Sequence, residues 1–177
     1  GVGATWQNSI FQFKDDLGFV SQYGTVHSLK ATAAYGDFNE AAMSRPIHKW
    51  IQDHLNYNRL RHIWAASDPL QGWVLFSIAI DASSTNNVVL MMDYRLWPEG
   101  PVKWAYWSAY DVNSLGLFVD TNGVRRVLLG SGDGYVLRSN IAARSLETSG
   151  SISAVAKTPH LNYGDPMIMK TINQASV

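Results

Sequence analysis

Short apolar segments that recur between turn signals constrain the fold of this chain more than any other feature. Most of the 177 residues belong to segments that alternate or run apolar before a turn rich in Gly, Pro or Asn interrupts them. This pattern is typical of β-strands, and turns about every 8–12 residues are typical of sandwiches, barrels and propellers. The predicted strands span residues 9–13, 17–22, 25–29, 61–67, 72–80, 88–96, 104–110, 114–120, 124–130 and 135–139, with strand-like pieces at 151–163 and 167–175.

One segment has a helical pattern instead. Ser44 is a plausible N-cap, and Pro46 suits the first turn of a helix. Apolar side chains then recur at helical spacing, at Ile47, Trp50, Ile51 and Leu55. The sequence therefore predicts an all-β fold with one short helix at about residues 45–56.

Two stretches resemble variants of one unit. Residues 8–29 and 113–139 both begin Asn-Ser-aliphatic, and each continues as strand, acidic turn, strand, Gly-containing turn and strand. Repeated meanders of this kind are typical of propeller blades. At roughly 40–50 residues a blade, the chain would supply three to four blades of the about four to eight that propellers have. We therefore predict one propeller-like domain over residues 1–177, or an incomplete part of a larger propeller.

Composition narrows the classes of partner. Lys and Arg together number 14, as do Asp and Glu, so the sequence predicts no basic stripe for nucleic acid. No apolar stretch reaches the roughly 20 residues of a membrane helix, and there is no cysteine for disulfides or thiolate chemistry. Charged residues make up 16%, against about 25% in typical soluble domains. We therefore expect much of the surface to lie against other protein, and the opening residues "GVGATWQNSI" suggest part of a longer polypeptide.

A glycine-rich stretch, "GSGDG" at 130–134, could form a phosphate loop, a calcium loop or a hairpin turn. Phosphate loops open a helix, whereas these glycines precede a predicted strand. A calcium loop needs more carboxylates than Asp133 supplies. Asn-Gly and Asp-Gly pairs tolerate the positive φ of tight turns. We therefore predict structural turns at Asn122, Gly123, Gly130, Gly132, Asp133 and Gly134.

Candidate catalytic and metal-binding residues form no convincing motif. The histidines lack the i, i+4 spacing of a helical zinc pair, since His48 and His54 are six apart. Carboxylates near strand ends could converge for glycoside hydrolysis, at Asp81, Asp93, Asp111 and Asp120. Aspartate at a strand end is also ordinary turn chemistry. We expect no catalytic residue, metal or cofactor, and a glycoside-active enzyme is the weaker alternative.

Tryptophans are the remaining feature. Five lie between residues 64 and 107, where they could stack on a ligand or fill gaps between sheets. Trp104 and Trp107 are three residues apart, so on one strand they point to opposite faces. We favour core or interface positions, with Trp97, Trp104 and Trp107 as interface candidates.

The order of these pieces resembles a β-propeller domain of tail and head–tail connector proteins of tailed bacteriophages. The resemblance rests on the opening "GATWQNSIFQFKDDLGFVSQYGTVHSL", on a Ser-x-Pro-Ile element before the helix at 44–47, and on "NNVVLMMDYRLWPEGPVKWAYWS". It continues through "VLLGSGDGYVLRSN" to "KTPHLNYGDPMIMK", and so covers most of the chain.

The resemblance implies a non-enzymatic structural protein of the virion, in the tail, neck or adaptor. Its implied partners are portal, adaptor or tail subunits, in a homo-oligomeric ring assembled in the host cytoplasm. No nucleic-acid or membrane contact is expected. The loops at 81–87 and 95–103 are the candidate faces for such contacts. The leading alternative is a glycan- or receptor-binding propeller whose tryptophans line a ligand face.

Overall fold

A computed structural model describes residues 3–35, 42–108, 111–139, 146–147 and 150–151. The chain divides into two compact units, Gly1–Ile141 and Ala142–Val177. In the second unit, β11 (Leu146–Glu147) pairs antiparallel with β12 (Gly150–Ser151). The strand-like pieces predicted at 151–163 and 167–175 lie outside the described residues, apart from Ser151.

The first unit is built from three antiparallel sheets, each formed by strands that follow one another in the chain. This confirms the all-β class, and every strand predicted before residue 140 is present with ends shifted by a few residues. The first sheet holds β1 (Ile10–Phe13), β2 (Asp16–Val20) and β3 (Val26–Ser28). The second holds β4 (Trp64–Asp68), β5 (Trp73–Ile78), β6 (Val88–Asp93) and β7 (Lys103–Ser108). The third holds β8 (Val112–Val119), β9 (Arg125–Ser131) and β10 (Val136–Arg138).

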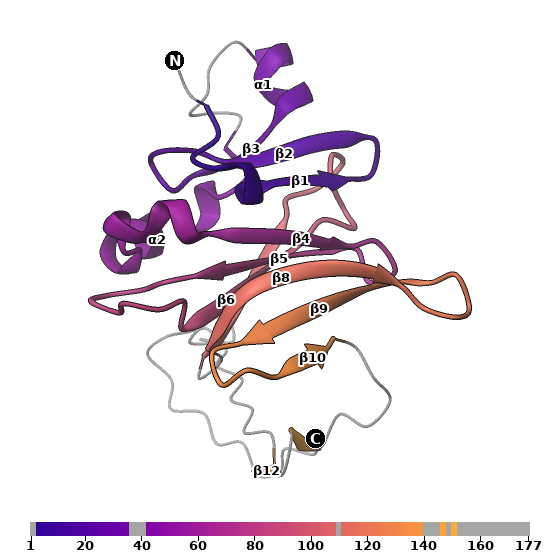
Figure 1. Ribbon diagram of the computed structural model, residues 1–177. Coiled ribbons are helices and arrows are strands. Elements are labelled where there is room, and N and C mark those ends of the chain that lie inside the picture. The colour runs from indigo at the N-terminus through magenta and orange to yellow at the C-terminus, as the bar shows by residue number, and fades with distance from the viewer. Residues whose placement is uncertain (1–2, 36–41, 109–110, 140–145, 148–149, 152–177) are drawn as a thin grey trace, which may run out of the picture. The chain divides into compact units, whose positions relative to one another are not determined.

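The second sheet lies between the other two (Figure 1). Successive side chains of a strand point to opposite faces. Phe76, Leu90 and Tyr106 are in register and face the first sheet, whereas Ser77, Val89 and Trp107 face the third. β5 and β6 are therefore apolar on both faces. Within the described residues no sheet closes on itself, and the propeller arrangement stays a prediction.

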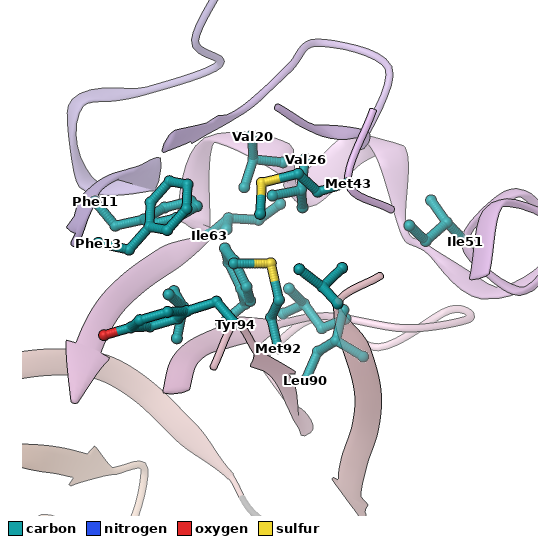
Figure 2. Close-up of a cluster of buried hydrophobic side chains, with 14 of the residues drawn as sticks. Phe11, Phe13, Val20, Val26, Met43, Ile51, Ile63, Leu90, Met92 and Tyr94 are labelled. Carbon is teal, nitrogen blue, oxygen red and sulfur yellow. The ribbon is translucent and has the colours of Figure 1, made fainter. Parts of the chain in front are cut away.

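The larger core lies between the first and second sheets (Figure 2). Phe11 and Phe13 of β1 point toward the second sheet, where the Phe11 ring meets Phe76 edge-on at a centroid distance of 5.2 Å. Phe13 meets Tyr94 in the same way at 5.5 Å. Edge-to-face pairs of this kind add to the stabilisation from burial. This packing holds the first sheet on the second.

The predicted helix is present in two parts. A 3₁₀ turn spans Arg45–Ile47, and α2 spans His48–His54. Ser44 precedes the 3₁₀ turn, but its hydroxyl does not cap it and instead accepts the backbone N–H of Val26 at 3.0 Å. A further 3₁₀ segment, Tyr57–His62, occupies the first residues of the strand predicted at 61–67, and another, Gln7–Ser9, precedes β1.

A second helix, α1 (Leu29–Tyr35), was not predicted from the sequence. The prediction of one helix is therefore incomplete. The hydroxyl of Ser28 accepts the N–H of Ala31 at 3.0 Å, and the Asp16 carboxylate accepts the N–H of Lys30 at 3.2 Å. Asp16 lies on β2, and its carboxylate also accepts the Ser28 hydroxyl. The helix start is thus completed by a residue distant in sequence, which a local pattern does not reveal.

Candidate functional site

The turn predicted at Asn122 and Gly123 is a tight hairpin between β8 and β9. Gly123 has a φ of 75°, and its N–H donates to the Asp120 carbonyl at 2.9 Å. The Asp120 carboxylate accepts the N–H groups of Asn122 and Val124, both at 2.9 Å. The Val124 N–H, helped by the Arg126 guanidinium, lowers the pKa of Asp120. Asp120 therefore organises this turn.

The glycine-rich stretch is also a hairpin, between β9 and β10. Gly134 has a φ of 85° and donates to the Ser131 carbonyl at 3.1 Å, while the N–H of Asp133 donates to the Ser131 hydroxyl at 3.2 Å. Gly130 lies within β9, so the prediction of a turn at this residue is wrong, whereas Gly132 lies in the turn and its N–H donates to the Asp111 carbonyl at 2.8 Å. The hairpin interpretation of "GSGDG" is confirmed.

The three tryptophans named as interface candidates are partly buried within the first unit. Trp97 and Trp104 pack against the core between the first and second sheets, and Trp107 packs against the core on the other side. The indole N–H of Trp104 donates to the Met43 carbonyl at 3.2 Å. Trp104 and Trp107 thus lie on opposite faces of β7, as the sequence predicts, and do not form one stacking platform.

Three of the four aspartates considered for catalysis are each held by a different basic neighbour. Asp81 contacts His54 at 3.0 Å, Asp93 contacts the Arg95 guanidinium at 2.6 Å, and Asp120 contacts Arg126 at 3.1 Å. The hydrogen bonds from Arg95 lower the pKa of Asp93, and Asp93 in turn raises the pKa of Arg95. Across the described residues no group of three His, Asp or Glu side chains is placed to hold a metal ion.

A surface hollow lies between α2 and β7 and has a volume of about 550 Å³. We call it the α2–β7 groove. That volume is within the usual range of ligand sites, about 300–1,000 Å³. Its lining residues are Pro46, Ile47, Lys49, Trp50, Asp53, His54, Leu90, Trp104, Ala105 and Tyr106.

Aromatic rings are part of the lining of the groove. Trp50 of α2 stacks on Tyr106 of β7 with centroids 5.6 Å apart and 25° between the planes. The Tyr106 side chain is exposed, and it lies on β7, a strand at the edge of the sheet. The Trp50–Tyr106 pair therefore joins the helix to the sheet edge.

Charged side chains form the rim of the groove. Lys49 and Asp53 pair at 2.6 Å across one turn of α2, and both are largely exposed. His54 is held at the end of α2 by Asp81. The opposite charges of Lys49 and Asp53 offset each other, and the other side chains that line the groove are mostly apolar or aromatic.

The groove was not predicted from the sequence. Trp50 was assigned only to the apolar face of a helix, and Tyr106 only to a strand. The sequence signal that could have indicated the groove was Tyr106, an aromatic residue on the strand predicted last in its meander. Their contact depends on how α2 packs over the sheet.

In comparisons with known proteins, no protein-family profile, curated protein or solved structure matches the chain. In the part of the chain that the structure describes, no helix is long and apolar enough to cross a membrane.

Proposed function

We propose that this chain is a non-enzymatic structural component of a tailed-phage virion, in the tail or the head–tail connector. The observation that carries the proposal is the arrangement of the first unit, in which three consecutive meanders form three sheets with the second between the others. Consecutive antiparallel meanders packed face to face are what a series of propeller blades requires. This arrangement agrees with the order of motifs on which the phage resemblance rests.

Exposed apolar side chains on the third sheet support the proposal that this chain contacts other proteins. Leu117 and Val119 on β8, and Tyr135 and Val136 near the β9–β10 turn, are each more than half exposed. Apolar surface of this kind often marks contacts with other proteins. The proposed partners are portal, adaptor or tail subunits, with copies of the chain arranged in a ring.

The alternatives receive less support from the geometry. The glycoside-active enzyme would need converging carboxylates, and Asp81, Asp93 and Asp120 each contact a separate basic side chain. The glycan-binding alternative would need tryptophans on one face, and Trp104 and Trp107 lie on opposite faces.

Mass spectrometry on purified phage particles from the source of the sequence tests the proposal. We expect peptides of this chain to travel with capsid and portal proteins through a density gradient. As a control for nonspecific adhesion, the free chain is added to particles that lack it. The same gradient should then separate the free chain from those particles. Absence of the peptides from washed particles would refute the virion assignment.

Glycan titration separates the leading alternative. We expect no quenching of tryptophan fluorescence by glycans, since the proposal gives these side chains packing roles. Saturable quenching would favour the binding module.

A further inference from the structure

The tip of the β8–β9 hairpin carries the only Asn-Gly pair of the sequence, Asn122-Gly123. Both residues are exposed. Asparagine is a chemically labile residue, because its side-chain amide can react with the backbone nitrogen of the next residue. Glycine in that next position has no Cβ to obstruct the approach, and its backbone reaches conformations that other residues avoid. The hairpin tip therefore presents the residue pair that is best suited to this reaction, in contact with solvent.

The closed turn holds the nitrogen that would attack. Three consecutive backbone N–H groups of the turn donate to Asp120: those of Asn122 and Val124 reach its carboxylate, and that of Gly123 reaches its carbonyl, each at 2.9 Å. The guanidinium of Arg126 holds the same carboxylate at 3.1 Å. The Gly123 nitrogen is thus engaged while the turn is closed, and it becomes available when the turn opens.

The neighbouring hairpin between β9 and β10 offers a comparison within the same sheet. Asp133-Gly134 has the same spacing and is also exposed, and the Gly134 N–H donates to the Ser131 carbonyl at 3.1 Å. Its side chain is a carboxylate, however, which is a poorer electrophile than the amide of Asn122. The first hairpin is therefore the reactive one of the two.

We propose that Asn122-Gly123 is a self-modification site, at which opening of the β8–β9 turn lets Asn122 convert to isoaspartate, and that Asp120 sets the rate by keeping the turn closed. The reaction needs no enzyme, and water is its only co-reactant. It does not depend on the virion assignment, because it follows from the residue pair and the hydrogen bonds of the turn.

The chemistry proceeds in two balanced steps. The Gly123 nitrogen gives its proton to a solvent base and attacks Cγ of Asn122, which closes a five-membered succinimide ring. The bond from Cγ to the side-chain nitrogen breaks, and that nitrogen takes up a proton and leaves as ammonia. Water then opens the ring at the side-chain carbonyl to give aspartate, or at the main-chain carbonyl to give isoaspartate. No atom is oxidised or reduced.

The product no longer fits the turn. Isoaspartate lengthens the main chain by one carbon and adds a carboxylate beside Asp120, where two like charges repel. We therefore expect the N–H groups of residues 122–124 to lose their common acceptor, and the last pair of the hairpin, Val119 with Arg125, to open. Leu117 and Val119 of this hairpin are exposed apolar residues, so the modification alters part of the surface that we propose for protein contacts.

Peptide mapping by mass spectrometry tests the proposal on the purified full chain, incubated at physiological temperature in a mildly alkaline buffer. The reference is the blocked peptide acetyl-Val-Asp-Thr-Asn-Gly-Val-Arg-amide, the sequence of residues 119–125, which is too short to form a stable hairpin. We expect isoaspartate to accumulate at Asn122 in both. The chain should react about 10–100 times more slowly than the peptide, because hydrogen bonds to a carboxylate favour the closed turn. Asn58, which is exposed and precedes Arg59, should keep its amide and serves as the internal control.

Variants of the hairpin separate the reaction from its control by Asp120. Asp120→Ala removes the carboxylate that accepts two N–H groups, and should speed the reaction of the chain by at least about tenfold. Asp133→Ala, an exposed aspartate of the neighbouring hairpin, is the matched control and should leave the rate unchanged. Asn122→Gln should yield no product at this position, since the corresponding ring has six members and closes slowly.

Three outcomes would overturn the proposal. If Asn122 of the chain keeps its amide long after the peptide has reacted a hundredfold further than expected, the turn does not open and the site is inert. If the chain and the peptide react at the same rate, the turn does not protect Asn122. If a folded Asp120→Ala chain reacts at the unaltered rate, Asp120 does not control the reaction. Should Asp120→Ala fail to fold, the comparison of chain and peptide still decides, because it needs no variant.

Discussion

The two cores on either side of the second sheet differ in size and chemistry. Among the described residues, the core facing the first sheet has sixteen buried apolar residues and the core facing the third sheet has seven. The larger core includes Phe11, Phe13, Phe76 and Tyr94, whereas no aromatic residue is among the buried members of the smaller one. Since stabilisation scales with buried apolar area, we expect the larger core to contribute more to the stability of the fold than the smaller one.

A polar junction accompanies the smaller core. The Ser77 hydroxyl donates to the Val112 carbonyl of β8, and the Asn86 side-chain amide donates to the Ser77 hydroxyl at 2.9 Å and to the His62 carbonyl at 2.8 Å. Ser77 and Asn86 are fully buried. The interface between the second and third sheets therefore includes directional hydrogen bonds, whereas the interface between the first and second sheets depends on aromatic packing.

The largest effect is expected in the larger core. Phe76→Ala removes a ring that packs edge-on against Phe11 and stacks on Trp104 at 5.9 Å. Truncation of a buried phenylalanine costs about 3–5 kcal/mol of unfolding free energy. Urea denaturation measures it, with Tyr135→Ala as the exposed control. A cost under about 1 kcal/mol would contradict the assignment of Phe76 to the principal core.

A smaller effect is expected in the core facing the third sheet. Leu129 is buried between β9 and the second sheet. Leu129→Ala should cost about 2–3 kcal/mol, near the low end for buried leucine, because few large side chains surround it. The same denaturation measures it. If Leu129→Ala cost more than Phe76→Ala, the ranking of the two cores would be reversed.

The polar junction should contribute less than either core. Asn86→Ala removes the amide that donates to the buried Ser77 hydroxyl and to the His62 carbonyl, and leaves both acceptors without this donor. We expect a loss of about 1–2 kcal/mol. Thr85→Ala, at an exposed neighbouring position, is the control. Equal stability of the two variants would show that the junction does not support the third sheet.

The smallest effect concerns pH and lies on the side of the first sheet. Burial lowers the pKa of His27, which stacks on Phe19 at 5.5 Å. The unfolded chain therefore takes up a proton at a higher pH than the folded chain, and stability falls as pH drops below about 6.5. One such group changes stability by at most about 1.4 kcal/mol per pH unit.

Denaturation at pH 7, 6 and 5 measures this dependence. His27→Gln should flatten it, and His48→Gln, at an exposed position, is the matched control. An unchanged slope in His27→Gln would show that His27 does not titrate on unfolding.

Local chemistry made much of the fold predictable. The turns at Gly123 and Gly134 follow from Asn-Gly and Asp-Gly pairs, and both adopt the positive φ that these pairs favour. Alternation along β7 predicted that Trp104 and Trp107 face opposite sides. These features depend on neighbours within a few residues.

Features that depend on distant contacts were missed. α1 begins where Asp16 of β2 caps it, and Asn86 is buried although 81–87 is a polar loop that we predicted as an exposed face. The α2–β7 groove requires Trp50 and Tyr106 to meet across the fold. No local pattern specifies such contacts, because they depend on how sheets and helices pack.

Amide hydrogen exchange of the intact chain tests the central claim that two unequal cores hold three sheets together. We predict the slowest exchange in β5 and β6, intermediate protection in β1 and β2, and faster exchange in β8 and β9 through partial opening of the smaller core. Protection of β8 and β9 equal to that of β5 and β6 would contradict the account.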